Sequence, residues 1–242
     1  MTTISTNLQA NLHTVKGRIS AACAAVGRPP ESVALLAVSK TWPAEAVRSV
    51  AALGQRAFGE NYVQEAVDKI AALADLRTGN DGLIWHFIGP LQSNKTRPVA
   101  EHFDWVHSID RLKIAQRLSE QRPDHLPPLQ VCLQVNVSGE ESKSGCAPEE
   151  AIALATAIAA LPRLTLRGLM AIPEPTEDAA LLHQRFAMLR QLQATLADKG
   201  LMLDTLSMGM SHDLETAIAE GATLVRVGTA IFGERNYPKE SS

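Results

Sequence analysis

The amino-acid sequence predicts an α/β protein with one domain over residues 1–242, a TIM-type (β/α)8 barrel that carries an extra N-terminal helix. Short apolar segments alternate with helical patterns along nearly the whole chain. Most of these segments are apolar throughout, as parallel strands covered on both faces tend to be. Eight strand–helix units within 242 residues match the barrel in number and in length.

The first element expected is a helix that precedes the barrel. Its apolar residues recur at helical spacing, and they are Ile4, Leu8, Leu12, Val15, Ile19 and Val26. Gly27 and the pair Pro29-Pro30 then end this helix.

The elements of the barrel itself follow in alternation. Segments rich in β-branched or aromatic residues predict strands at 33–39, 56–59, 85–89, 105–109, 130–137, 165–172, 205–208 and 223–227. Helical patterns predict helices at 44–53, 62–76, 95–102, 111–121, 148–161, 178–199 and 212–220, with a short last helix after Val227. An open doubly wound sheet is the alternative, but no Gly-x-Gly-x-x-Gly motif follows the first strand.

The composition argues against several classes of protein. The net charge is −3 with no run of Lys and Arg, which argues against nucleic acid or an anionic membrane as the partner. The longest apolar stretch is too short to span a bilayer, and no signal-peptide pattern opens the chain. The three widely spaced cysteines, Cys23, Cys132 and Cys146, fit a reducing compartment, so we expect a cytoplasmic protein. The seven histidines show no ligand spacing, and no metal site is expected.

Two loops at the expected C-terminal mouth of the barrel have the composition of a phosphate site. In such barrels, the loops after strands 7 and 8 often bind phosphate through backbone N–H groups at helix starts. Gly209 and Gly228 allow the backbone to approach a ligand closely, while Ser207 and Thr229 supply hydroxyl donors. The alternative is that the glycines only form tight turns and Ser211 caps a helix. The presence of both loops together favours phosphate.

Lys40 ends the first apolar strand and is the candidate for covalent chemistry. Desolvation at the barrel mouth lowers the pKa of a lysine, and a neutral amine can attack a carbonyl to form a Schiff base. The alternative is a lysine that reaches solvent or pairs with a carboxylate such as Glu60. A phosphate site on the same rim favours a ligand with both an aldehyde and a phosphate, either pyridoxal 5′-phosphate (PLP) or a phosphosugar.

Arg226 helps to distinguish these two ligands. It precedes the second phosphate loop by two residues, so its side chain can point into the barrel near a ligand ring. A cation beside a pyridine nitrogen keeps that nitrogen unprotonated and weakens the ring as an electron sink, the reverse of a carboxylate partner. The alternative is a salt bridge inside the barrel, for example with Glu60.

Eight motifs taken in order resemble the pyridoxal phosphate homeostasis proteins, the YggS/PROSC family. The motifs are AVSKT, FGENYVQE, WHFIGPLQSNK, SIDR, SKSG, LRGLMAIP, LSMGMSHD and RVGTAIFG. The likeness is strongest over residues 30–235. It implies a single barrel similar to the N-terminal domain of bacterial alanine racemase.

The resemblance also implies roles for individual residues. PLP is carried as an internal aldimine on Lys40, with Asn61 beside the cofactor and Arg226 facing the pyridine nitrogen. The residues that hold the phosphate are Ser207, Gly228 and Thr229. Lys143 matches a lysine thought to take part in cofactor handling, and the alternative for it is a solvated loop charge. Trp42 departs from the family, because relatives often have a second lysine there, so no role of that lysine is carried over.

The likeness to alanine racemase raises a catalytic alternative, an amino-acid racemase or a related isomerase or lyase. Racemisation needs acid/base groups on both faces of the substrate. The racemase takes its second group, a tyrosine, from a partner's C-terminal domain, whereas this chain ends soon after strand 8 and has only Tyr62 and Tyr237. We therefore expect a monomeric PLP carrier and regulator of vitamin B6 and amino/keto acid balance rather than an enzyme, with apo PLP-dependent enzymes as possible recipients. A lysine-dependent phosphosugar aldolase is a third option.

Overall fold

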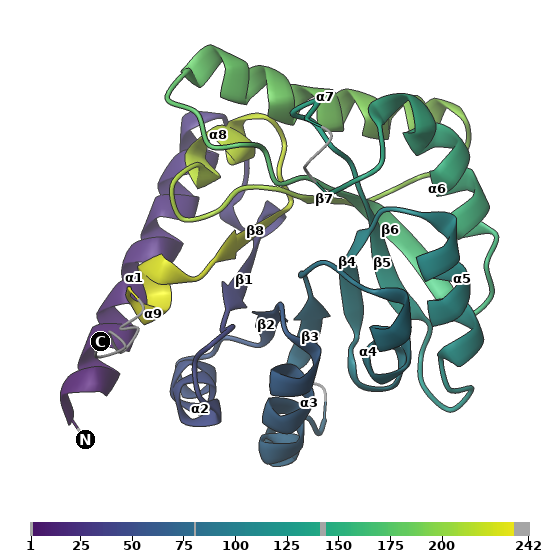
Figure 1. Cartoon of the computed structure of the whole chain (residues 1–242). Helices are drawn as coiled ribbons and strands as arrows, with labels where there is room; N and C mark the ends of the chain where they lie inside the picture. Colours follow the sequence, from purple (N-terminus) through teal and green to yellow (C-terminus); the bar gives the residue numbers. More distant parts are fainter. Residues whose placement is uncertain (1, 80, 141–143, 235–242) are drawn as a thin grey trace, which may run out of the picture.

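The structure is a closed barrel of eight parallel strands with helices around it, which confirms the predicted fold class (Figure 1). The computed structural model describes the backbone of residues 2–79, 81–140 and 144–234, with side chains from residue 7 onward. The strands are β1 (Ala34–Val38), β2 (Ala57–Glu60), β3 (Ile84–Phe87), β4 (Trp105–Ile109), β5 (Leu129–Gln134), β6 (Leu164–Met170), β7 (Thr205–Ser207) and β8 (Leu224–Val227). They lie in sequence order, and β8 pairs with β1 to close the barrel, so the open sheet is ruled out.

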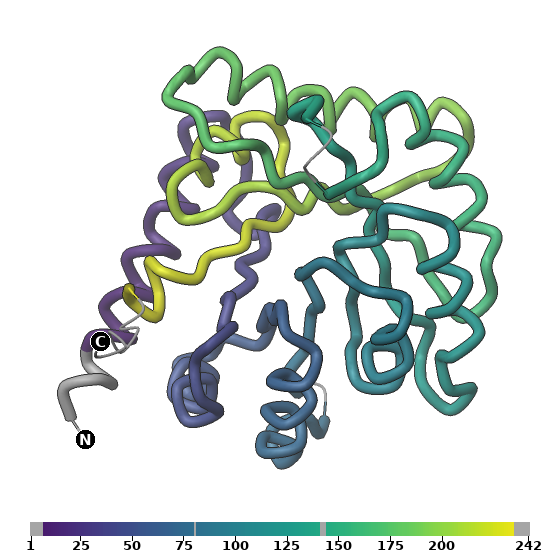
Figure 2. The backbone as a smooth tube through the Cα atoms, viewed as in Figure 1, coloured from purple at the N-terminus to yellow at the C-terminus, as the bar shows by residue number. Residues whose placement is uncertain are grey.

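The helices lie on the outside of the barrel, and in Figure 2 the chain passes through helices between the end of one strand and the start of the next. The α-helices are α1 (Thr2–Ala25), α2 (Ala44–Ala52), α3 (Val63–Ala72), α4 (Thr96–His102), α5 (Leu112–Gln121), α6 (Ala151–Ala159), α7 (Ala179–Asp198), α8 (Leu214–Ala219) and α9 (Thr229–Phe232). Helix α1 precedes the first strand and α9 follows the last. The short 3-10 helices are η1 (Pro30–Ser32), η2 (Ala74–Leu76), η3 (Ser93–Lys95) and η4 (Pro148–Glu150).

Helix α1 is the predicted extra helix, and it packs beside α2, α8 and α9 (Figure 1). The predicted stripe of Leu8, Leu12, Val15 and Ile19 is buried. Val26 does not belong to it, because α1 ends at Ala25 and this side chain is 42% exposed. The chain therefore brings its first helix against its last two, which adjoin the C-terminal mouth of the barrel.

Three predicted helices differ from the structure by more than one residue at an end. In the predicted helix 148–161, the first three residues form η4 and the α-helix α6 ends at Ala159. The predicted helix 62–76 divides into α3 and η2, because Leu73 turns out of the helical conformation at ψ 20° and Leu76 then accepts the backbone N–H of Leu83. The predicted helix 212–220 begins at Leu214, because the carboxylate of Asp213 accepts the N–H of Met210 at 2.5 Å and holds the preceding residues in a turn.

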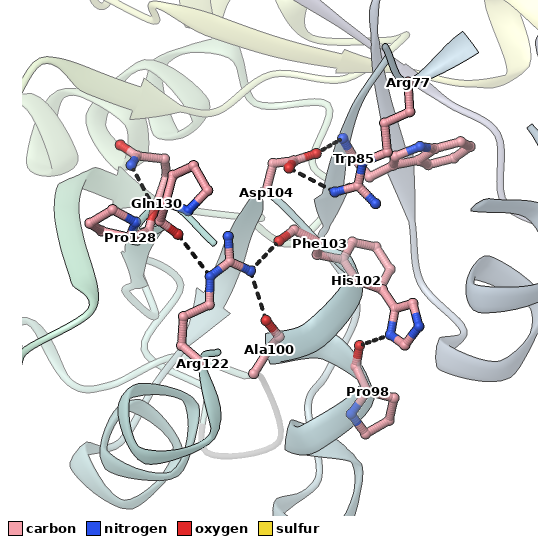
Figure 3. Close-up of polar contacts among 11 residues, drawn as sticks. Arg77, Trp85, Pro98, Ala100, His102, Phe103, Asp104, Arg122, Pro128 and Gln130 are labelled. Carbon is pink, nitrogen blue, oxygen red and sulfur yellow. Dashed lines mark hydrogen bonds and ion pairs between the residues drawn. The ribbon is translucent and has the colours of Figure 1, made fainter. Parts of the chain in front are cut away.

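Polar contacts fasten the N-terminal end of the barrel, opposite the mouth (Figure 3). The guanidinium of Arg122 donates to the carbonyls of Ala100 and Phe103 at 2.7 and 2.8 Å. Asp104 accepts the backbone N–H of Trp85 at 2.8 Å and pairs with Arg77 at the same distance. These contacts join η2, β3, α4 and α5 at one end and leave the other end for a site.

Three features of the described part of the chain bear on function. None of its helices is long and apolar enough to cross a membrane. Within the same residues, no group of three His, Cys, Asp or Glu side chains is placed to hold a metal ion. Cys23, Cys132 and Cys146 are buried free thiols.

Candidate functional site

A cavity of about 290 Å³ opens at the C-terminal mouth of the barrel. Its walls come from the residues that follow β1, β2, β3, β6, β7 and β8, as the barrel rule predicts. Five of the residues predicted from the sequence line it together: Lys40, Asn61, Arg226, Gly228 and Thr229. Ser207 is not among the lining residues. Lys143 lies outside the described residues.

Lys40 reaches the cavity from a tight turn between β1 and α2. The strand ends at Val38, Thr41 takes a left-handed conformation with φ 68°, and Pro43 precedes the first residue of α2. The Lys40 side chain is half-buried and lines the cavity wall. An amine at such a boundary is reachable by a ligand while part of its stem is packed against protein.

Glu60, the alternative partner for Lys40 or Arg226, forms a buried ion pair with Lys69. Its Oε1 lies 2.6 Å from Nζ of Lys69 and 2.6 Å from Oγ of Ser39. Burial raises the pKa of Glu60, and Lys69 and Ser39 oppose that effect. The carboxylate therefore lies against Ser39 and Lys69, next to the turn that carries Lys40.

Arg226 is the buried cation of the site. Its Nη1 donates to the carbonyl and the hydroxyl of Ser207 at 2.6 and 2.7 Å, and its Nη2 donates to the carbonyl of Ala171 at 2.9 Å. Burial lowers the pKa of Arg226 to about 10, which leaves it charged at neutral pH. Three hydrogen bonds thus fix a cation in the wall of the cavity.

Ser207 lies beneath the cavity rather than on its surface. The side chain is fully buried, and its hydroxyl accepts from Arg226 and contacts Nδ1 of His107 at 2.7 Å. These two contacts hold the hydroxyl against Arg226 and His107. The role expected for Ser207, donation to a phosphate, stays a prediction.

A chain of buried polar groups extends from Arg226 into the barrel. Nε2 of His107 lies 2.8 Å from Nδ1 of His86. The Ser207 hydroxyl accepts from Arg226 and shares a second hydrogen bond with Nδ1 of His107, so one continuous hydrogen-bonded series joins Arg226, Ser207, His107 and His86. Both imidazoles are therefore neutral, since burial lowers the pKa of His86 to about 3 and that of His107 well below 6.5.

The two loops predicted for phosphate meet at one side of the cavity. The hydroxyl of Thr229 lies 3.2 Å from that of Ser211, which joins the loop after β8 to the loop after β7. Gly209 has φ 95°, a conformation that favours glycine. A Cβ at Gly228 would lie 3.2 Å from the carbonyl oxygen of Val38, so this loop packs directly against β1.

Helix termini contribute less at these loops than the sequence suggests. Ser211 does not cap α8, because Asp213 is the N-cap residue and the Ser211 hydroxyl contacts Thr229. α9 has only four residues, so its dipole is small. Hydroxyl groups and close backbone packing are the main features that this side of the cavity offers.

Trp42 contributes an aromatic ring to the wall of the cavity. This ring stacks on Phe232, with ring centroids 5.8 Å apart. Tyr62 precedes α3 and is 52% exposed. Tyr237 lies outside the described residues.

Several site residues were not anticipated from the sequence. His86 and His107 each occupy the interior of a strand, where an inward-facing polar residue is the only signal. Ile88, Ile172 and His212 also line the cavity; each lies in one of the eight motifs, but no site role was predicted for it. Their place in the cavity wall depends on the closed barrel, which brings six strand ends together.

The barrel and the amine and cation at its mouth define a class of protein, the alanine racemase N-terminal domain, whose family profile matches residues 6–236. Within that class, the chain belongs to the pyridoxal phosphate homeostasis proteins. It is 66% identical over 232 residues to the Pseudomonas aeruginosa pyridoxal phosphate homeostasis protein, covering 96% of this chain and 97% of the relative.

Two further comparisons agree. The pyridoxal phosphate homeostasis protein of Escherichia coli K12 is 57% identical over 235 residues, with 95% of this chain and 97% of that protein covered. The structure of PipY from Synechococcus elongatus PCC7942 with PLP bound superposes with a TM-score of 0.77 at 42% identity. The match covers 89% of this chain and all of PipY.

Proposed function

We propose that this protein binds PLP as a Schiff base on Lys40 and serves PLP and amino/keto acid homeostasis as a carrier, without being a catalyst. The observation that carries the proposal is one cavity lined by an amine, Lys40, a buried cation, Arg226, and the hydroxyl of Thr229. PLP has an aldehyde, a ring nitrogen and a phosphate, so each of the three groups has a partner of matching chemistry. The PLP-bound structure of PipY supports this choice of cofactor.

The residues present fit this cofactor. Oδ1 of Asn61 is buried at the cavity and has no hydrogen-bond partner among the described residues, so it is available to a donor on a ligand. Gly228 lines the cavity and has no side chain, so the loop presents its backbone to the cavity at this position. A volume of about 290 Å³ lies at the lower end for small-molecule sites, which suits one small cofactor.

The covalent step uses only the amine of Lys40 and the aldehyde of the cofactor. The neutral Nζ adds to the aldehyde carbon, and loss of one water molecule leaves a carbon–nitrogen double bond. PLP supplies an electrophilic carbonyl and an electron-withdrawing ring when bound. Arg226 donates only and stays charged at neutral pH, so it leaves the ring nitrogen unprotonated and favours holding over catalysis.

Reductive trapping tests the proposal. Borohydride added to the protein with PLP should produce a mass increase on the peptide that contains Lys40, and Lys40→Ala should not gain it. A phosphosugar aldolase would instead be trapped with a sugar phosphate and would gain a different mass. Absence of any adduct in the wild-type protein would overturn the proposal.

The non-catalytic part has its own test. A racemase or related enzyme would exchange the Cα hydrogen of amino acids in deuterated water, using a second proton-transfer group opposite Lys40. We expect no exchange across a set of single-enantiomer amino acids. Exchange that depends on Lys40 would show that the protein is an enzyme.

Three further features complete the proposal. The chain acts as one domain and as a monomer, because all the walls of the cavity come from a single barrel. Three buried free thiols suit a reducing compartment, and we infer the cytoplasm.

The recipients of its PLP are apo PLP-dependent enzymes. Transfer is measured by mixing the loaded protein with an apoenzyme and following the recovery of that enzyme's activity.

A further inference from the structure

We propose that Lys69 and Glu65, both on α3, are positioning residues that fix the backbone turn carrying Lys40 in the geometry needed for reaction with an aldehyde. This inference rests on the proposed function, since it concerns the same amine. Neither side chain lines the cavity. They act through the two residues that flank Lys40, namely Ser39 and Thr41.

On the N-terminal side of Lys40, the contacts converge on Ser39. Nζ of Lys69 donates to the carbonyl oxygen of Ser39 at 2.9 Å. The Ser39 hydroxyl donates to Glu60 at 2.6 Å, and Glu60 is itself paired with Lys69 at the same distance. All three residues are buried. Both the carbonyl and the side chain of Ser39 are therefore bound to one ion pair shielded from water.

On the C-terminal side, Glu65 holds Thr41. The backbone N–H of Thr41 donates to Oε1 of Glu65 at 2.5 Å, and the same oxygen lies 3.1 Å from Nζ of Lys69. Thr41 has φ 68°, which is unfavourable for a β-branched residue and persists only where the surroundings enforce it. The hydrogen bond that the Thr41 N–H donates to Glu65 is a contact that enforces this conformation.

The two sets of contacts share Lys69, so the backbone on both sides of Lys40 is tied to α3 and β2 by one cluster. The cluster sets the direction in which the Lys40 side chain leaves the turn. Attack on a carbonyl needs the amine close to the carbon and correctly aligned. A looser turn should slow the covalent step and leave non-covalent binding of the ring and phosphate intact.

The test compares four variants of α3 with the wild-type protein. Glu65→Ala removes the acceptor of the Thr41 N–H, and Glu65→Leu removes it while retaining a long side chain in case the alanine variant folds poorly. Glu65→Gln removes the charge and keeps an acceptor oxygen. Asp68→Ala is the matched control, because it removes an exposed carboxylate from the same helix that hydrogen bonds to Gln64.

Two readouts separate positioning from a general loss of structure. The first is the rate at which PLP becomes trappable by borohydride on Lys40. The second is the calorimetric affinity for pyridoxine 5′-phosphate, which has the ring and the phosphate but no aldehyde. We expect Glu65→Ala and Glu65→Leu to lower the trapping rate about tenfold, the effect of losing one charge-assisted hydrogen bond. Pyridoxine 5′-phosphate affinity should stay within about twofold, and Glu65→Gln and Asp68→Ala should resemble the wild type in both readouts.

A double-mutant cycle tests the mechanism. Glycine adopts a φ of 68° without strain, so Thr41→Gly should reduce the effect of Glu65→Ala on the trapping rate to less than half its size on a logarithmic scale. Equal effects of Glu65→Ala in both backgrounds would overturn the role assigned to the hydrogen bond with Thr41.

The remaining outcomes are also decisive. Equal trapping rates for Glu65→Ala, Glu65→Leu and Asp68→Ala would overturn the inference, as would parallel losses of trapping and of pyridoxine 5′-phosphate affinity. In both cases the wild-type protein still forms its adduct on Lys40, so the proposed function survives. Failure of the wild-type protein to form that adduct is the separate result that removes the proposed function itself.

Discussion

The hydroxyl of Ser207 lies at the end of a barrel strand, as the sequence predicts, and in the structure it contacts protein groups. The sequence presents a hydroxyl at the end of a barrel strand, which is where a phosphate donor is expected. In the structure this hydroxyl joins the cation Arg226 to the neutral imidazole of His107. A polar group that joins two others in a buried hydrogen-bonded network contributes to the stability of the whole network.

Ser207→Ala should lower the free energy of unfolding by about 1–3 kcal/mol, because it leaves the buried Nδ1 of His107 without this hydrogen-bond partner. Ser49→Ala is the control, since this exposed hydroxyl only donates within its own helix, to the carbonyl of Glu45. Urea unfolding of both variants measures the difference. Equal stability of the two variants would mean that the hydrogen-bonded network from Arg226 to His86 does not contribute to the free energy of unfolding.

The same network predicts a dependence of stability on pH. The pKa of His86 falls to about 3 in the folded protein from 6.5, so below pH 6.5 the unfolded chain binds a proton that the folded protein does not. Stability is then lost as pH falls, by about 1.4 kcal/mol per pH unit for this histidine. His107 acts in the same direction.

Urea unfolding between pH 6.5 and 5 measures this loss before most carboxylates titrate. A free energy of unfolding that stays constant over this range would contradict the buried neutral state of the two histidines.

Among the elements, α1 connects the barrel with the loops that face the cavity. Arg18 pairs with both oxygens of Glu215 at 2.7 and 2.9 Å and donates to the carbonyl of Ser211 at 3.0 Å. Asn11 donates to the carbonyl of Ile231 in α9 at 2.9 Å. A helix added before the barrel therefore holds the loop after β7 and the helix after β8 from outside.

Arg18→Ala should weaken PLP binding by about threefold to tenfold, because the loop that bears Ser211 loses its outer support. Arg48→Ala is the matched control, since Arg48 in α2 forms a similar bidentate pair with Asp75 and does not line the cavity. Exposed ion pairs contribute only about 0–1 kcal/mol, so Arg48→Ala should leave binding unchanged. Equal affinities of the two variants in a PLP titration would show that α1 does not support the site.

At the scale of the whole molecule, the barrel gathers residues from six of its strand ends around one cavity. The strand order closes β8 on β1 and so places these residues around a single space. We propose that one copy of the chain is enough to bind the cofactor.

The protein should accordingly be a monomer of 26.0 kDa in light scattering, both with and without PLP. A dimer that dissociates with loss of PLP would instead indicate that a partner subunit contributes to the site.

The sequence predicts the barrel well because its signals are local. Alternation of apolar strands and helices, together with length, determines the class, and Lys40, Asn61, Arg226, Gly228 and Thr229 do line one cavity. The burial of Ser207 was not predicted, because it depends on which groups meet inside the barrel. The Lys69–Glu60–Glu65 cluster was missed for the same reason, since these charges are ordinary in a helix and at a strand end until α3 is packed behind the Lys40 turn.

The most direct test of the account is the visible absorption spectrum of the purified protein with PLP. The account predicts a yellow wild-type protein and a folded Lys40→Ala variant without the visible band, because the band requires the carbon–nitrogen double bond on this lysine. Circular dichroism establishes that the variant is folded. A colourless wild-type protein, or a Lys40→Ala variant with the same band, would contradict the account.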